Sequence, residues 1–282
     1  MITFELSDDN LFLNKELLKL SLLIGRDNFL FAFTGLSNGK IKSVVEYSLI
    51  DRDHKSNLES ELIQTLINNI QDKSLVQKVI AGFVTPEYSI IPATIENKID
   101  LKIALSPVSV KQYLDDFTIV KSEVKSLDSL TLFPVRNEIL TFLNANFRSV
   151  TPVHGNDYLI CFVPDYIIEK SFVFCNFTTD GIQLLTFVEG KLRTSNVIFN
   201  SSMDEMLYNI ISAYYRNGLP INSIPLYLSG RVQKESLICK TLLDHIKRVE
   251  FVNFDISQHY SMKFNQMPGH YFFDVALLSS CV

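Results

Sequence analysis

Residues 20–33 read LSLLIGRDNFLFAF, in which a glycine turn that contains an aspartate joins two apolar segments. Turns of this kind open several nucleotide-binding domains, because backbone N–H groups in the turn can receive a phosphate. Gly25 and Asp27 are the residues that such a role would use. The chemistry that this turn suggests is therefore the binding of a phosphorylated ligand.

A second motif, Gly35-Leu36-Ser37-Asn38-Gly39, matches the G-x-S-x-G pattern of the nucleophile elbow in hydrolases. That elbow needs a strand before the serine and a helix after it. Here the residues that follow, KIKSVVEYSLI, alternate and are rich in β-branched side chains. Because Asn38-Gly39 is also a strong hairpin signal, the motif predicts a hairpin turn and no serine nucleophile.

The composition argues against several further kinds of site. A net charge of −5 leaves no basic patch for nucleic acid. Four irregularly spaced cysteines and five histidines without metal-ligand spacing favour reduced, buried thiols and give no support to a metal site. The acidic N-terminal segment does not resemble a secretory signal, and no apolar run reaches the length of a membrane helix. We therefore expect a cytoplasmic protein that neither inserts into membranes nor binds nucleic acid.

A plan of three strands, a helix and a fourth strand occurs twice along the chain. The strands predicted for the first copy are 19–26, 29–35, 40–50 and 77–84. Its helix is predicted from a capping box and from apolar residues at helical spacing, namely Ser56 with Glu59, and Leu58, Leu62, Ile63, Leu66, Ile67 and Ile70. The strands predicted for the second copy are 171–178, 181–190, 191–199 and 223–230. Its helix begins with the capping box of Ser202 and Glu205 and ends at Asn217-Gly218.

Further elements lie between and after the two copies. A strand at 129–135, a helix at 136–147 and a strand at 148–155 are predicted, whereas residues 156–170 fit either a buried strand or a helix broken near Pro164. Together the elements predict a mixed α/β protein of two ribonuclease-H-like lobes. We expect these lobes at residues 1–130 and 131–282, with a final helix near 269–280 that could pack on the first lobe.

The duplicated plan resembles the actin-like ATPase superfamily, in which two such lobes face each other across a nucleotide cleft. More specifically, the chain resembles an uncharacterised bacterial family of actin-like fold, a domain of unknown function related to the actin-like pilus-assembly and type II secretion proteins. The segments that carry this resemblance cover nearly the full chain: FVTPEYSIIPATI (83–95), EGKLRTSNVIF (189–199), DEMLYNIISAYYRNGLPINSIPLYLSGRV (204–232), LLDHIKRVEF (242–251) and GHYFFDVALLSSC (269–281). These loose patterns indicate fold and family rather than activity.

The resemblance implies that an active member begins each lobe with a D-x-G turn, whose aspartate organises Mg²⁺. Here Leu23 stands two residues before the first glycine and Thr179 two residues before the second. The adenosine loop, which usually carries paired glycines, corresponds to Ser229-Gly230-Arg231, where the bulky cation would crowd a purine. If the cleft is active, the expected nucleotide-binding residues are Gly25, Asp27, Asp180, Gly181 and Gly230.

We therefore expect a pseudo-ATPase of actin-like fold, without enzymatic activity, cofactor or metal, that binds a protein partner. The sequence indicates neither the partner nor the oligomeric state. The alternative is an active actin-like ATPase or kinase-like enzyme that binds ATP with magnesium through the displaced Asp27 and Asp180. We set aside a ribonuclease-H-type nuclease, because the predicted central strands lack the carboxylates that two metal ions need.

Overall fold

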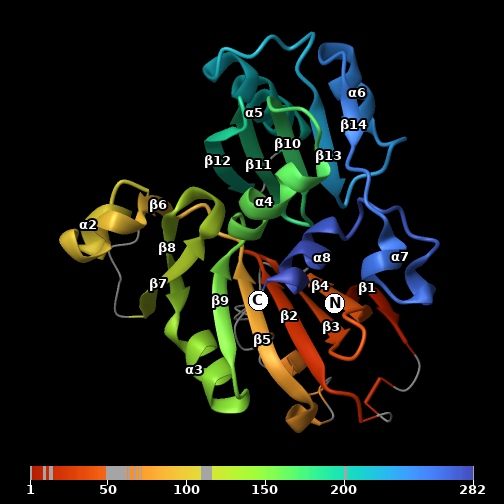
Figure 1. Cartoon of the computed structure of the whole chain (residues 1–282). Coiled ribbons are helices and arrows are strands. Elements are labelled where there is room, and N and C mark those ends of the chain that lie inside the picture. Colours follow the sequence, from red (N-terminus) through yellow and green to blue (C-terminus); the bar gives the residue numbers. More distant parts are fainter. Residues whose placement is uncertain are drawn as a thin grey trace.

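The structure is a computed structural model that describes residues 2–8, 11–12, 15–48, 72–108, 116–199 and 202–281, with positions 62, 64–66, 68 and 70. Its described strands form a six-stranded, a five-stranded and a three-stranded sheet. Figure 1 shows the two larger sheets one above the other, with the smallest sheet beside the first. The result is the mixed α/β architecture that the repeated plan predicts.

The six-stranded sheet contains all four predicted strands of the first copy. In spatial order its strands are β1 (Ile2–Ser7), β4 (Ile41–Ser48), β3 (Asn28–Gly35), β2 (Leu18–Ile24), β5 (Val76–Phe83) and β9 (Val150–His154). β5 is parallel to both β2 and β9. β3 is buried along its whole length, as expected for a strand covered on both faces.

The helix predicted before β5 is described only in part. Leu62, Leu66 and Ile70 are buried against this sheet, which fits the predicted apolar face. The predicted capping residues Ser56 and Glu59 lie outside the described residues.

The five-stranded sheet contains the predicted strands of the second copy. Its spatial order is β12 (Lys191–Phe199), β11 (Gly181–Val188), β10 (Phe172–Phe177), β13 (Leu226–Gly230) and β14 (Val249–Phe251). Helix α5 (Met203–Arg216) begins with the predicted capping box, because the Ser202 hydroxyl accepts the N–H of Glu205 and the Glu205 carboxylate accepts the N–H of Ser202. Gly218 follows the helix with a φ of +65°, which confirms the predicted C-terminal cap.

The three-stranded sheet has the order β6 (Ser89–Pro92), β8 (Ser129–Arg136) and β7 (Phe117–Val124). Helix α3 (Asn137–Asn146) leads from β8 to β9, as predicted. The ambiguous segment forms α4 (Asp157–Phe162) and a 3₁₀ turn (Val163–Tyr166), with Pro164 at the start of that turn. The other α-helices with described bounds are α2 (Leu101–Leu105), α6 (Leu237–His245), α7 (Ile256–His259) and α8 (Phe273–Ser280).

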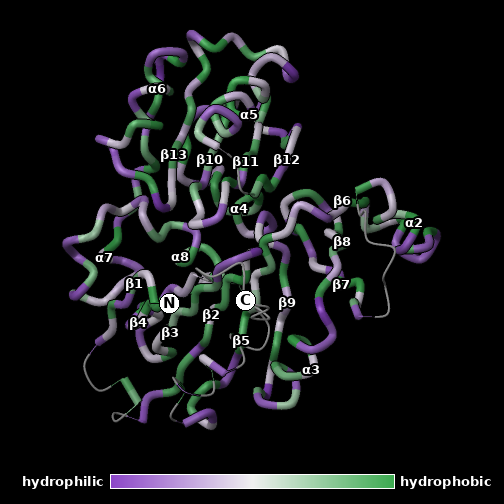
Figure 2. Tube along the Cα trace, turned by 180° about the vertical axis from the view of Figure 1, so that it is seen from behind, coloured by the Kyte–Doolittle hydropathy of each residue, from purple (hydrophilic) through white to green (hydrophobic). Residues whose placement is uncertain are grey.

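Helix α8 lies between the two large sheets (Figure 1). It contacts β2 and β5 of the first sheet and β13 of the second. Its residues from Phe273 to Ser279 are all buried, and the apolar ones among them belong to a core cluster that takes side chains from both sheets, such as Leu23 and Phe174. Figure 2 shows hydrophobic residues along the central strands and hydrophilic ones mainly at the periphery.

The chain passes from one large sheet to the other between β9 and β10. A division by sheets would therefore lie later in the chain than the predicted one between residues 130 and 131, where β8 pairs with β7. The two-lobe boundaries themselves stay a prediction.

Candidate functional site

The glycine turn between β2 and β3 faces the hairpin turn between β10 and β11. The backbone N–H groups of Arg26 and Asp27 donate to the carboxylate of Asp180, over 2.8 and 3.2 Å. Thr178 donates its hydroxyl to the same carboxylate over 3.1 Å. A Cβ at Gly25 would lie 2.2 Å from the Asn28 side-chain oxygen and 2.7 Å from this carboxylate, so both groups would have to shift. The N–H groups that could receive a phosphate thus bind a carboxylate of the same chain.

Burial of Asp180 raises the pKa of its carboxyl group, and the hydrogen bonds from the turn and from Thr178 counteract part of that rise. The two turns lie more than 150 residues apart in the sequence, so only the fold brings them together. Their contact is a direct bridge between the six-stranded and the five-stranded sheet.

A buried ion-pair cluster adjoins this contact. The Arg231 guanidinium donates to both carboxylate oxygens of Asp274 over 2.8 Å, and its Nε lies 3.4 Å from Glu46. The guanidinium carbon lies 4.7 Å from the ring centre of Phe272. Burial alone would lower the pKa of Arg231, but the Asp274 and Glu46 carboxylates outweigh it and raise the pKa. Glu46 also accepts the hydroxyl of Thr179 over 2.7 Å, which joins β4 to the second hairpin turn.

Uncharged polar side chains of the five-stranded sheet extend the ion-pair cluster. Asn176 donates to Gln183 over 2.8 Å and to Asp274 over 3.3 Å, and it accepts the Ser229 hydroxyl over 2.8 Å. Gln183 in turn donates to the side chain of Asn156 over 2.8 Å. The network thereby links β10, β11 and β13 to α8 and to the residue before α4, and it satisfies polar groups that would be costly to bury alone.

The space left between the sheets at this point has a volume of about 20 Å³. It is lined by Leu23, Gly25, Asn28, Leu30, Glu46, Val84, Thr178, Asp180, Gln183, Arg231 and Asp274. Such a cavity holds about one water molecule, whereas sites for drug-sized ligands measure roughly 300–1,000 Å³. Of the predicted nucleotide-binding residues, Gly25 and Asp180 line this small cavity.

The structure brings together three of the predicted site residues, Gly25, Asp27 and Asp180, at the contact between the two turns. The other two glycines have local reasons of their own. A Cβ at Gly181 would collide with the backbone oxygen of Ile198, and Gly230 has a φ of +84°. Their role in nucleotide binding stays a prediction.

The structure also bears on the G-x-S-x-G motif and on the expectations about metal sites and membrane helices. Ser37 lies in the hairpin between β3 and β4, which Gly35 closes by donating its N–H to the oxygen of Lys40 over 3.0 Å. The hairpin prediction is confirmed, and residues 36–40 form the loop between the two strands. Among the described residues, no three His, Cys, Asp or Glu side chains cluster in a way that could hold a metal ion. None of the described helices is long and apolar enough to cross a membrane.

A separate cavity of about 580 Å³ lies between β7, β9 and α4. At its base the Asp157 carboxylate accepts hydrogen bonds from the Ser122 hydroxyl, from the Thr131 hydroxyl over 2.6 Å and from the His154 N–H over 3.0 Å. Burial raises the pKa of Asp157 to about 7 against the effect of these bonds, and it lowers the pKa of His154 to about 4. Asp157 therefore joins three strands through one nearly enclosed carboxyl group.

Sequence and fold comparisons give this site its context. Residues 7–249 match the family described as a protein of unknown function, DUF3822. The chain belongs to this family. No protein of curated function matches it by sequence.

Among solved structures, the chain is similar to a Bacteroides thetaiotaomicron protein with actin-like ATPase fold and unknown function. The identity is 16%, the match covers 96% of this chain and 98% of the other, and the TM-score is 0.76. It is also similar to a chain of the PilM–PilN type IV pilus biogenesis complex, with 13% identity, coverage of 92% and 97%, and a TM-score of 0.60. The family member described here thus has an actin-like ATPase fold, as its sequence suggested.

Proposed function

We propose that this protein is a non-enzymatic member of the actin-like fold, a pseudo-ATPase that works by binding a protein partner. The observation that carries the proposal is the bond between the Asp180 carboxylate and the N–H groups of Arg26 and Asp27. A phosphate at this turn would need the same donors, and it would meet the negative charge of Asp180 within a few ångströms.

The ion-pair cluster supports the same proposal from the other side of the cleft. A nucleotide at this position would have to displace Arg231 from the Asp274 carboxylate. Removal of one partner from a buried ion pair costs about 3–5 kcal/mol, because the other charge stays buried without compensation. The binding energy of a nucleotide would first have to offset this cost. The ion pair therefore favours the conformation in which Arg231 fills this part of the cleft.

Similarity to a chain of the PilM–PilN complex supports a protein partner for this chain. A fold of this kind offers two lobes and several sheet edges for contacts with another protein, and such a role needs no metal or nucleotide. The cytoplasmic location expected from the sequence stays a prediction.

The proposal is tested by calorimetry and thermal unfolding of the purified protein with ATP and Mg²⁺. A ligand that reaches 100 times its dissociation constant stabilises a protein by about 2.7 kcal/mol, so binding would raise the melting temperature measurably. We expect no rise, no heat of binding at micromolar concentrations and no release of phosphate.

Two variants make the experiment decisive. Asp180→Ala frees the N–H groups of Arg26 and Asp27, so weak binding of an anion by this variant alone would support the blocking role of Asp180. Magnesium-dependent ATP binding by the unmodified protein that is lost in Asp27→Ala or Asp180→Ala would overturn the proposal in favour of an active ATPase.

A further inference from the structure

The two copies of the repeated unit differ at the outer edge of their third strand. In the first copy, β4 pairs on its outer side with the antiparallel strand β1, from Ile2 opposite Tyr47 to Ser7 opposite Ser43. In the second copy, the equivalent strand β12 is the last of its sheet, and within the described ranges no strand pairs with its outer side. Figure 1 shows both arrangements. The outer edge of the third strand is thus covered in the first copy, whereas no described strand covers it in the second copy.

The register identifies the backbone groups that β12 presents at this edge. In the turn between β10 and β11, the N–H of Thr178 donates to the oxygen of Gly181, so Gly181 faces β10. Because the direction alternates along an antiparallel strand, the residues of β11 that face β12 are Ile182, Leu184 and Thr186. Their partners on β12 are Ile198, Asn196 and Thr194. The N–H and C=O groups of Ser195 and Val197 therefore point outward, where an added strand could bond to them.

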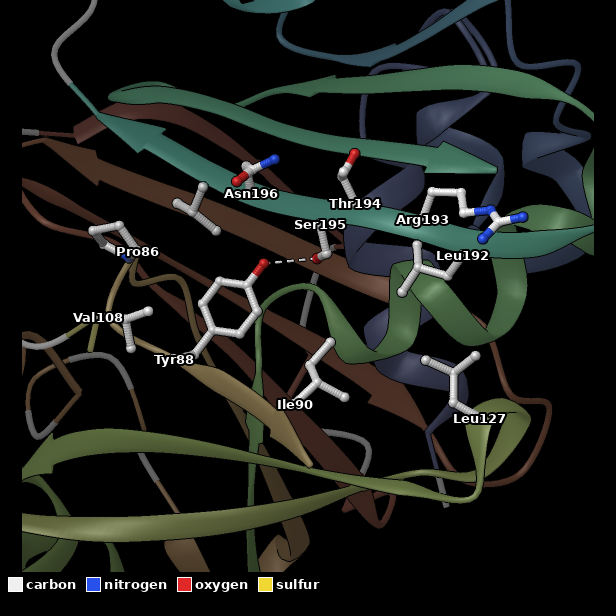
Figure 3. A pocket seen from close by; sticks show the side chains of 11 residues that line it. Pro86, Tyr88, Ile90, Val108, Leu127, Leu192, Arg193, Thr194, Ser195 and Asn196 are labelled. Atoms are coloured by element: carbon white, nitrogen blue, oxygen red, sulfur yellow. Dashed lines mark hydrogen bonds between the residues drawn. The ribbon is translucent and has the colours of Figure 1, made fainter. Parts of the chain in front are cut away.

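A cavity of about 450 Å³ lies against this edge, between β12 and the three-stranded sheet. Pro86, Tyr88 and Ile90 line the wall opposite β12 (Figure 3). Figure 3 also shows the hydrogen bond of 2.7 Å from the Tyr88 hydroxyl to Ser195. The volume lies within the range of pockets that enclose organic ligands, so the side chains of an added strand have room beside the edge.

The lining defines the chemistry of the segment that would fit. Leu127, Leu192 and Ile90 provide apolar contacts, and Arg193 is the one charged residue among the described residues that line the cavity. Arg193 is exposed and forms none of the ion pairs found within the described ranges. An extended segment with apolar side chains and a carboxylate would complement this wall. β1 has this kind of pattern, ITFELS, with Glu5 between apolar residues.

We propose that β12 binds an extended acidic-apolar segment of a partner protein as an added antiparallel strand, in the way that β1 covers β4. The partner segment would place apolar side chains in the cavity and a carboxylate at Arg193. This inference rests on the proposed function, for which it supplies the binding surface and the chemistry of the partner.

Amide hydrogen exchange, resolved by residue with NMR, tests the edge. In the free protein we expect the amides of Ser195 and Val197 to exchange faster than those of Thr194 and Asn196, which bond to β11. The probe is a synthetic library of peptides about six residues long, with alternating apolar residues and one acidic position. Peptides selected on the full-length protein should slow exchange at Ser195 and Val197 and leave Thr194 and Asn196 unchanged.

Charge variants supply the matched control. Arg193→Glu should weaken the selected peptides roughly fivefold, the effect of replacing an exposed attraction with a repulsion. Lys191→Glu changes the same charge on the same strand, but Lys191 is exposed and outside the cavity lining, so it should leave the affinity unchanged.

The inference is wrong if the library yields no binder, or if the binders protect no amide of β12 or bind Arg193→Glu as well as the unmodified protein. These outcomes differ from the result that would overturn the proposed function. That result is magnesium-dependent binding of ATP to the cleft. Protection of Ser195 and Val197 with no effect of ATP would support both.

Discussion

Replacement of Arg231 by methionine measures how much the buried ion-pair cluster between the two large sheets stabilises the fold. The guanidinium bonds to both Asp274 oxygens, lies near Glu46 and packs on the ring of Phe272. Methionine retains much of the apolar volume but removes the positive charge. Two buried carboxylates would then lose their partner, and this loss dominates the expected effect.

The magnitude follows from the burial of the cluster. The side chains of Arg231 and Asp274 are 9% and 1% exposed, so solvent screens their interaction little. Removing one partner of a buried ion pair destabilises a protein by about 3–5 kcal/mol, and loss of a cation–π contact adds about 1 kcal/mol. We expect Arg231→Met to lower the free energy of unfolding by about 4 kcal/mol and the melting temperature by roughly 10 °C.

The assay is urea unfolding followed by far-ultraviolet circular dichroism, because the chain contains no tryptophan. Asp274→Asn and the double variant complete a double-mutant cycle. We expect a coupling free energy of at least about 2 kcal/mol, since either single change already removes the bidentate pair. A loss below about 1 kcal/mol for Arg231→Met, with no coupling to Asp274, would refute the idea that this ion pair stabilises the fold.

Two further predictions concern stability elsewhere in the fold. The folded state binds the proton of Asp157 more tightly than the unfolded chain does, because its pKa is raised to about 7, so this group lowers the free energy of unfolding as the pH rises from about 4 to about 7. Asp157→Asn should therefore be more stable than the unmodified protein at pH 8 by up to a few kcal/mol and lose that advantage near pH 5. Urea unfolding midpoints measured at the two pH values would show this. His154, whose pKa is lowered to about 4, changes the free energy of unfolding with pH in the opposite direction, and it does so in both proteins. Gly230→Ala should lower the free energy of unfolding by more than about 2 kcal/mol, because φ is +84° and the new Cβ would collide with the oxygen of Phe177. Gly218→Ala is its control, since φ there is +65° but the Cβ meets open space, and equal melting temperatures of the two variants would contradict this account.

The fold could be predicted because its signals are local. The capping box of Ser202 and Glu205, the helix end at Asn217-Gly218 and the alternation of the strands each depend on residues a few positions apart. The repetition of these signals then identified the duplicated unit. Residues 156–170 stayed ambiguous because a buried helix and a buried strand are both apolar on every side, and α4 is such a helix.

The site could be predicted only in part, because its contacts are distant in the sequence. The family resemblance predicted that Arg231 would crowd a purine, but the sequence did not indicate that Glu46 and Asp274 would lie beside it. A signal for both acids was present. Each stands within an apolar run, VVEYS and FFDVALL, where a buried charge needs a partner. What the sequence lacked was the identity of that partner.

The position of Asp180 distinguishes the second turn from the D-x-G turn that the family resemblance implies. In an extended chain, adjacent side chains point in opposite directions, so an acid one residue before the glycine does not occupy the place of an acid two residues before it. Here the residue two before the glycine is Thr179, which bonds to Glu46, while Asp180 reaches the turn of the other sheet. Both residues of the second turn are therefore engaged with the first sheet. Under the proposed function, this displacement by one residue has two consequences: the carboxylate is absent from the position that the resemblance implies for a magnesium ligand, and it bonds instead to the N–H groups of the first turn.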